Sequence, residues 1–212
     1  MKEINQSAMS ALRERVTAEM SPKRARHTLA VESMAARLAA LYCPEKEQML
    51  RVAALLHDVT KEWLTERHAA FMRQHGIEPG ALDLAAPKTL HARTAALLIP
   101  DAFADYADPE VVAAVRWHTT GREDMTLCEQ IVYLADYIDE SRTFPDCVKL
   151  RSAFWDAHPE MMSEQERTAH LLRVLVMSFD MTITGLLEDG APVSPDTFCA
   201  RNSLILQQRI EK

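Results

Sequence analysis

The chain has 212 residues, of which 48% are hydrophobic and 26% are charged, and only 5 are glycine. This length suits one domain with a substantial core, or at most two small ones, and the composition favours a helix-rich globular protein. The 24 basic and 31 acidic residues give a net charge of −7, which argues against general binding to nucleic acid or an anionic membrane but leaves room for a local basic pocket.

The cysteines and the N-terminus indicate a cytoplasmic protein. Four widely separated cysteines form no Cys-x-x-Cys pair and therefore indicate neither a zinc knuckle nor a disulfide framework. They are Cys43, Cys128, Cys147 and Cys199. Residues 1–6 contain no apolar signal core, and no uninterrupted apolar run has membrane-spanning length. We expect a reducing compartment and no contact with a membrane.

Apolar residues at helical spacing predict three helices before residue 60. The first covers about residues 4–20, and its apolar stripe consists of Ile4, Met9, Leu12 and Val16. Ser21 and Pro22 then cap and open a second helix, which ends near Cys43. A third helix runs from about residue 45 to His57, where polar side chains end an apolar run.

The middle of the chain predicts further helices with an irregular segment between them. Residues 62–88 indicate a short helix ending at Gly76, followed by chain broken by prolines. Another helix follows around Leu90. Asp108, with a proline after it, opens the next helix, which ends near His118.

The C-terminal third contains two capping-box patterns, at Thr126 and at Ser163. The first opens a helix that carries Asp136, and the second opens a long amphipathic helix that stops at Gly190. Beyond residue 145 the helical signal between them weakens. A last helix runs from Pro195 to about residue 210, and because no alternating strand pattern or internal repeat occurs, we predict an all-α fold.

Six polar side chains interrupt the apolar stripes of these helices. They are His27, His57, Asp58, His91, His118 and Asp136. A single buried histidine is usually a hydrogen-bonded core residue, but four histidines and two acids are costly to bury unless something compensates them. A shared cation would do so, and imidazole and carboxylate ligands suit iron, manganese or zinc. Six ligands divide between two ions with Asp58 as the bridge, and an open dinuclear site activates water and supports in-line displacement at phosphorus.

Lys61 and the other four histidines are further ionisable residues whose positions bear on this site. Lys61 follows His57 by four residues and shares its helix face, which suits a cation that reaches for a phosphate. The alternative is a helix that surfaces here, with all three polar side chains solvated. The other four histidines are predicted to lie on the surface. They are His68, His75, His158 and His170.

The order of these residues resembles the HD-domain superfamily of metal-dependent phosphohydrolases, which have an all-helical fold. Further motifs resemble the YqeK-type family of symmetrical bis(nucleosyl)-tetraphosphatases, which split diadenosine tetraphosphate into two ADP. These motifs are Arg26-His27, Leu56-His57-Asp58-Val59-Thr60-Lys61, Leu90-His91, Trp117-His118-Thr119-Thr120-Gly121-Arg122, Tyr133-Leu134-Ala135-Asp136-Tyr137-Ile138 and Ser141-Arg142. The similarity extends from about Ser21 to Ala200-Arg201-Asn202, so it covers most of the chain.

The resemblance implies a domain organisation and a role for each residue. A single-domain HD helical bundle would cover residues 21–212, with the helix of residues 1–20 packed on it. The first ion would be held by His27, His57, Asp58 and Asp136, and the second, expected to be iron like the first, by Asp58, His91 and His118. Asp58 and Lys61 would be catalytic. The phosphate path would be lined by Lys61, Thr120, Gly121, Arg122 and Arg142, and completed from the last helix by Arg201 or Asn202.

This chain departs from the family pattern at two places. Family members commonly have Asp-Asn where this chain has Asp180-Met181, and Glu-Pro-Gly where it has Asp139-Glu140-Ser141.

Two alternative functions remain open. The nearest alternative is an HD-type nucleotidase that acts on a mononucleotide. A second is a non-catalytic HD scaffold that senses a ligand. The oligomeric state is open, with a homodimer as one option.

Overall fold

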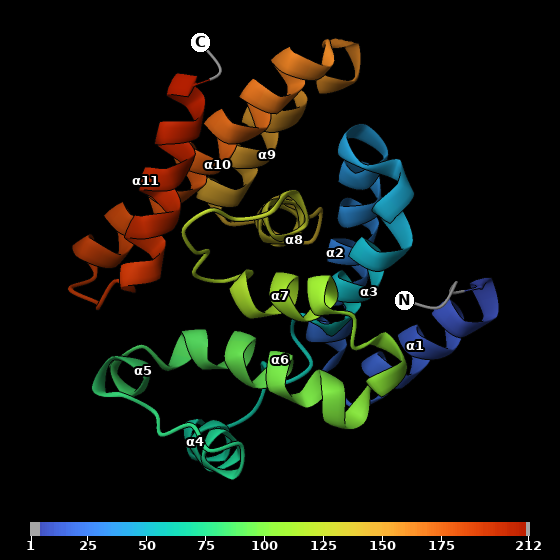
Figure 1. Cartoon of the computed structure of the whole chain (residues 1–212), viewed down its shortest axis with the longest axis vertical. Helices are drawn as coiled ribbons and strands as arrows, with labels where there is room; N and C mark the ends of the chain where they lie inside the picture. Colours follow the sequence, from blue (N-terminus) through green and yellow to red (C-terminus); the bar gives the residue numbers. More distant parts are fainter. Residues whose placement is uncertain (1–4, 211–212) are drawn as a thin grey trace.

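A computed structural model describes residues 5–210, and every regular element in that range is helical (Figure 1). The α-helices are α1 (Gln6–Ala18), α2 (Pro22–Tyr42), α3 (Glu47–Leu56), α4 (Thr65–Gln74), α5 (Ala81–Ala85), α6 (Leu90–Ala102), α7 (Pro109–Trp117), α8 (Leu127–Ile138), α9 (Pro145–Trp155), α10 (Glu164–Glu188) and α11 (Pro195–Ile210). The prediction of a single-domain all-α fold is confirmed. Ile4, which was assigned to the first helix, lies outside the described residues.

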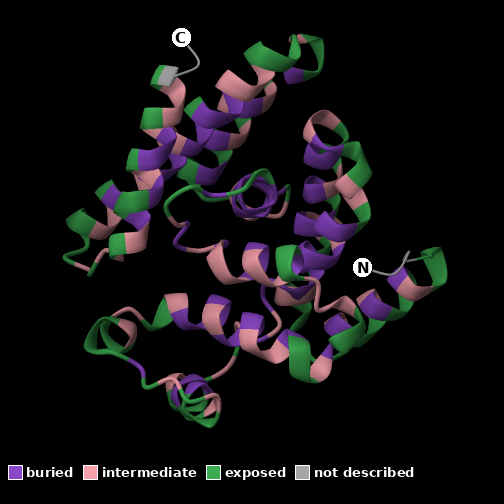
Figure 2. Ribbon diagram, in the orientation of Figure 1, coloured by how far each residue is buried: buried purple, intermediate pink, exposed green. Residues whose placement is uncertain are grey.

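The helices α2, α3, α7 and α8 form the centre of the domain (Figure 1). α8 is buried on nearly all sides, and Figure 2 shows it as a purple ring viewed end-on. α10 packs against it on one side and α11 packs on α10, while α6 packs on α7 on the other side. α1 contacts α2 and α3 and buries Met9, Leu12 and Val16. One hydrophobic core therefore holds together helices whose ends carry the polar cluster.

Side-chain caps fix where three of these helices begin, as predicted. Ser21 accepts a hydrogen bond from Arg24 N at 3.3 Å, and Pro22 occupies the first turn of α2. Thr126 and Ser163 each form a capping box with a glutamate three residues later. Each cap satisfies backbone donors that the first turn leaves without partners.

Two helices appear where the sequence signal was weak. α9 covers part of the segment beyond residue 145 and buries Cys147, Leu150 and Phe154, which recur at steps of three and four. α5 is a five-residue helix with no buried residue, in the segment predicted to be irregular. Three apolar residues are enough to hold α9 because tertiary packing supplies most of the stability of a short helix.

Two of the four histidines predicted to lie on the surface are buried, so that prediction was wrong for them. His68 is 3% exposed and its Nδ1 lies 2.8 Å from Thr94 Oγ1. His170 is 4% exposed, and its Nε2 donates to Phe154 O at 2.9 Å. Burial lowers the pKa of both rings, and each is a hydrogen-bonded core residue. His75 and His158 do reach the surface.

Among the described helices, only α10 is long and apolar enough by length and composition to cross a membrane. Arg173 and Asp180 interrupt its apolar residues, so the sequence showed no uninterrupted run. The helix packs against α8, α9 and α11, and 44% of its most apolar window is buried inside the domain.

Candidate metal centre

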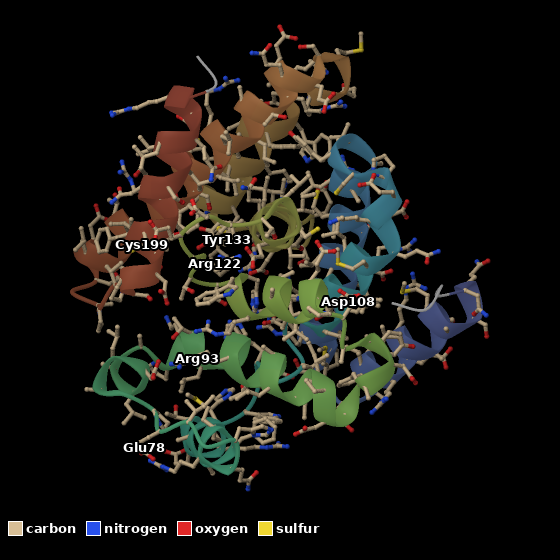
Figure 3. The ribbon with its side chains drawn as sticks, in the orientation of Figure 1. Glu78, Arg93, Asp108, Arg122, Tyr133 and Cys199 are labelled. Atoms are coloured by element: carbon tan, nitrogen blue, oxygen red, sulfur yellow. The ribbon has the colours of Figure 1, made fainter. Side chains whose placement is uncertain are left out.

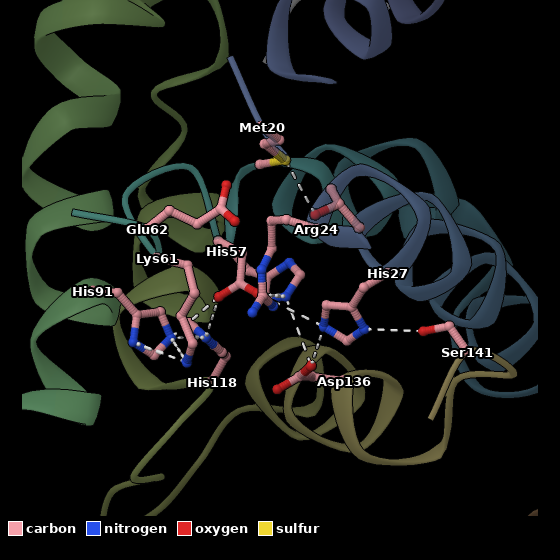
Figure 4. Close-up of polar contacts among 12 residues, drawn as sticks. Met20, Arg24, His27, His57, Lys61, Glu62, His91, His118, Asp136 and Ser141 are labelled. Carbon is pink, nitrogen blue, oxygen red and sulfur yellow. Dashed lines mark hydrogen bonds and ion pairs between the residues drawn. The ribbon is translucent and has the colours of Figure 1, made fainter. Parts of the chain in front are cut away.

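Five helices meet at the polar cluster and each brings one end to it (Figure 4). His27 lies in the second turn of α2, His57 follows the last residue of α3, and Asp58 comes directly after it. His91 lies in the first turn of α6, and His118 follows the last residue of α7. Asp136 lies in the last turn of α8. The structure thus brings together all six residues that the sequence placed in one site.

The carboxylate of Asp58 stands between two pairs of histidines. Its Oδ2 lies 3.3 Å from His57 Nε2 and 3.7 Å from His27 Nε2. Its Oδ1 lies 3.2 Å from His91 Nε2 and 3.9 Å from His118 Nε2. Each oxygen therefore faces its own pair of imidazoles.

Asp136 completes the group around His27 and His57. Its Oδ1 lies 2.9 Å from His27 Nε2 and 3.7 Å from His57 Nε2. On the other side of Asp58, the Nε2 atoms of His91 and His118 are 3.0 Å apart. The ligand atoms of His27, His57 and Asp136 lie within 4.8 Å of one another, as do those of His57, Asp58 and His118.

Backbone carbonyls orient three of the four imidazoles. The Nδ1 atoms of His57, His91 and His118 lie 2.6, 2.8 and 2.7 Å from the carbonyl oxygens of the residues three positions earlier. A neutral ring that donates its Nδ1–H in this way presents a lone pair at Nε2. All three Nε2 atoms face the cluster, so each ring is oriented to ligate a cation in its neutral form.

His27 is oriented by side chains instead. Its Nδ1 lies 3.2 Å from Ser141 Oγ (Figure 4) and 3.3 Å from Asp139 Oδ2. Asp139 is fully buried and also accepts a hydrogen bond from Ser141 N at 2.8 Å. A carboxylate behind a ligating histidine fixes the ring and strengthens it as a ligand.

The donor set fits divalent metal ions. His27 Nε2 and His57 Nε2 are buried and face the carboxylate oxygens of Asp136 and Asp58 without a well-directed hydrogen bond, an arrangement that a cation bound between them would satisfy. The set contains four imidazoles, two carboxylates and no thiolate, a combination typical of iron, manganese or zinc with positions left open.

Burial and charge push the ionisation of these groups in opposite directions. Burial alone raises the pKa of Asp58, but His57, His91 and Lys61 outweigh it and hold that pKa well below its usual value. For His57, burial lowers the pKa, but Asp58 and Asp136 overcome it and raise the pKa to about 10. Burial, with the nearby positive charge of His57, lowers the pKa of His118 to about 4. Both acids are therefore ionised at neutral pH.

Three cationic side chains surround the acids. Arg24 Nη1 donates to Asp58 Oδ2, and Arg142 Nη2 donates to Asp136 Oδ1. Lys61 Nζ lies 3.1 Å from His91 Nε2. Arg24 and Arg142 also line a cavity of about 510 Å³ that opens beside His27, together with Lys23, Arg26, Ser141, Thr143 and Phe144. This basic cavity is the mouth of the site, and its charge suits a polyphosphate.

Four residues predicted to line the phosphate path are held elsewhere. Arg122, in the connection between α7 and α8 (Figure 3), donates through Nε to buried Glu129 at 3.0 Å. Arg201 donates to Asp180, and exposed Asn202 contacts Arg201. Thr120 donates its hydroxyl to Gly121 O at 2.9 Å. No contact in the described part of the chain joins these side chains to the cluster.

Gly121 serves close packing. Its φ of +62° is one that residues other than glycine rarely adopt, and a Cβ there would stand 2.6 Å from Phe179 Cζ and 2.8 Å from Ala200 Cβ. The residue therefore allows the turn after His118 to pack against α10 and α11.

Sequence reasoning missed several residues that the structure brings to the cluster. Thr119, the neighbour of the threonine that was predicted, has its hydroxyl 3.2 Å from His91 Nε2 and 3.1 Å from His118 Nε2. Arg24 precedes His27 by three residues and so shares its helix face. Asp139 and Ser141 were noted only as departures from a family pattern, yet they hold His27 in place.

Comparison with known proteins places this fold and cluster in a defined class. The HD-domain family model matches residues 24–141, and the chain belongs to the HD-domain family of hydrolases. A crystal structure described as a predicted HD superfamily hydrolase involved in NAD metabolism, from Clostridium acetobutylicum, is 32% identical and has a TM-score of 0.78. The alignment covers 93% of this chain and 97% of that one.

Two relatives show to which family of HD-domain hydrolases the chain belongs. The symmetrical bis(5′-nucleosyl)-tetraphosphatase of Halalkalibacterium halodurans is 32% identical over 194 residues, which are 92% of this chain and 95% of the relative. That of Bacillus subtilis is 30% identical over 190 residues, 90% of this chain and 94% of the relative. Within the HD-domain hydrolases, the chain therefore belongs to the family of symmetrical bis(5′-nucleosyl)-tetraphosphatases, as its motifs implied.

Proposed function

We propose that this protein hydrolyses dinucleoside tetraphosphates symmetrically, and in particular diadenosine tetraphosphate to two ADP, in the cytoplasm. The observation that carries the proposal is the position of Asp58, whose two oxygens face two different pairs of histidines. That arrangement suits a carboxylate that bridges two cations. The activity named for the relatives from H. halodurans and B. subtilis supports the choice of substrate.

The proposed metal assignment follows the two faces of Asp58. His27, His57, Asp58 and Asp136 would hold the first ion, and Asp58, His91 and His118 the second, with iron as the expected metal and manganese or zinc as alternatives. When bound, such a pair supplies Lewis acidity and a reactive water at neutral pH.

The residues of the chain itself bind and orient the polyphosphate. Arg142 and Arg24 line the mouth, where their guanidinium groups can donate to phosphate oxygens. Lys61 lies in the turn after α3 with its ammonium group beside His91 of α6, and burial lowers the pKa of Lys61. These cations stabilise the charge that develops as the phosphoanhydride bond breaks. Ionised Asp58 lies at the centre, where it can also accept a proton from the attacking water.

Product analysis tests the proposal and separates it from the rival nucleotidase. Protein loaded with iron or manganese is incubated with diadenosine tetraphosphate, and the products are separated by ion-exchange chromatography. Two equivalents of ADP and no AMP or ATP are expected. AMP is tested as a substrate in a parallel incubation. Release of inorganic phosphate from AMP, with no cleavage of the tetraphosphate, would establish the mononucleotidase instead. No turnover of either compound would favour the ligand-sensing scaffold.

A further inference from the structure

A second cavity adjoins the mouth of the site. It has a volume of about 360 Å³ and lies between the end of α8, the start of α9 and the C-terminal half of α10. Its walls include Tyr137, Phe144, Leu150 and Met181. Phe144 also lines the mouth, so the two cavities lie next to each other and share this ring. Tyr137 directly follows Asp136, which ties the cavity to the cluster along α8.

The walls of this cavity are aromatic and apolar. Phe144 is 64% exposed, and no aromatic ring among residues 5–210 stacks on it. The hydroxyl of Tyr137 lies 2.7 Å from Thr182 Oγ1, so a hydrogen bond holds the second ring in place. A planar heteroaromatic ring gains about 1–3 kcal/mol by stacking on an exposed aromatic side chain.

The two cavities differ in the charge of the residues that line them. The mouth is lined by Lys23, Arg24, Arg26 and Arg142, whereas the only charged residues that line the second cavity, within the described chain, are Asp146 and Asp189. Both acids are exposed. They repel a phosphate group, and they can accept hydrogen bonds from an exocyclic amino group. The mouth therefore suits the polyphosphate, and the second cavity suits a neutral ring with amino donors.

We propose that this second cavity binds one nucleobase of the dinucleoside polyphosphate, with its ring on Phe144 and its amino edge toward Asp146 and Asp189. The proposal rests on the proposed function and adds to it the residues that select a nucleotide over a bare polyphosphate. Met181 extends the apolar wall of the cavity.

The first test removes the stacking surface. In Phe144→Ala we expect KM for diadenosine tetraphosphate to rise about 5- to 150-fold, because base stacking contributes about 1–3 kcal/mol, with kcat changing much less. Phe198→Ala is the matched control, since Phe198 is a 42% exposed phenylalanine on α11 outside both cavities. An unchanged KM in Phe144→Ala would overturn the proposal.

The second test fills the cavity from its wall. Gly185 lines the cavity in α10, and a Cβ added there meets no atom within 4 Å. Gly185→Leu should therefore fold, gain helix propensity and occupy the space of the base. We expect a rise in KM of at least 10-fold. Thr184→Leu, at an exposed position of the same helix, is the control.

A binding measurement separates failure of this proposal from failure of the proposed function. Calorimetry on the metal-loaded protein compares ADP with inorganic pyrophosphate, which lacks a base. We expect the wild type to bind ADP more tightly, and both variants to lose that preference. If the wild type prefers ADP but does not hydrolyse diadenosine tetraphosphate, the proposed function fails and the base site stands. If hydrolysis occurs and the variants keep the preference for ADP, the base site fails alone.

Discussion

Asp58 Oδ1 lies 3.2 Å from His91 Nε2, on the side of the carboxylate that faces away from His57. Asp58 lies in the turn after α3 and His91 in the first turn of α6, and the two meet only in the folded chain. Their contact divides the cluster into two ligand groups that share one carboxylate. Loss of Asp58 should therefore affect both groups, whereas loss of His91 should affect one.

Replacement of Asp58 by alanine should remove the shared ligand of both groups. We expect the metal content to fall from about two ions per chain, and hydrolysis to fall by about 10²–10³ or more, because the electrostatic core of the site is lost. Metal analysis of the purified protein and an ADP-release assay measure the two effects. Asp101→Ala is the control, because Asp101 is exposed and pairs with His75 outside the cluster. Full activity in Asp58→Ala would contradict the metal assignment.

Replacement of His91 should empty one group and spare the other. In His91→Gln we expect about one ion per chain, and a loss of activity larger than the 10- to 100-fold typical of an outer partner. His68→Gln is the matched control, since His68 is equally buried but bonds to Thr94 outside the cluster. That variant should lose thermal stability and keep both ions. Equal metal contents in the two variants would show that His91 is not a ligand.

The sequence predicted the helices and the six clustered residues well, because both depend on local spacing. His27, His57 and His118 each continue an apolar stripe at steps of three or four, so their inward direction could be derived before the fold was known. The burial of His68 and His170 was missed, although Met72 and Val174, each four residues later, are buried and gave the same signal.

The phosphate contacts were harder to predict, because a long cationic side chain reaches partners that spacing does not define. Arg122 follows a predicted ligand closely, yet buried Glu129 holds it. Arg24 precedes His27 by one helical turn and reaches Asp58, which is 34 positions away. Helical spacing predicts the position of the backbone of such a residue, but tertiary contacts determine where its charged group lies.

Metal uptake should release protons, because the pKa of His57 is raised to about 10 while a metal ligand must be a neutral imidazole. At pH 7 the metal-free protein carries this proton, and binding displaces it. The apparent affinity should therefore rise about tenfold per pH unit from pH 7 to 9 and level off near pH 10. Calorimetric titrations in buffers of different ionisation enthalpy measure the released protons. An affinity independent of pH would contradict a protonated His57.

The same shifts set the pH dependence of the metal-free fold. A raised pKa means that His57 stabilises the fold fully below pH 6.5, and that this contribution is lost as the pH rises toward 10. The pKa of His118 is lowered to about 4, so its contribution is lost as the pH falls from 6.5 toward 4. We expect the chelated protein to unfold at the highest temperature near pH 6.5. Thermal scans in chelator from pH 5 to 9 test this, and a steady rise in melting temperature up to pH 9 would contradict it.

A substitution at Gly121 tests whether this residue serves close packing or substrate binding. Gly121→Ala places a methyl group 2.6 Å from Phe179 Cζ at a φ of +62°, so overpacking and backbone strain should together lower the free energy of unfolding by about 2–4 kcal/mol. Gly190→Ala is the matched control, because Gly190 has the same φ of +62° but open space around its Cβ position. It should lose only about 1 kcal/mol, from strain alone. Denaturant unfolding of both variants isolates the packing term. If Gly121→Ala were as stable as Gly190→Ala and its KM alone increased, the residue would belong to the phosphate path.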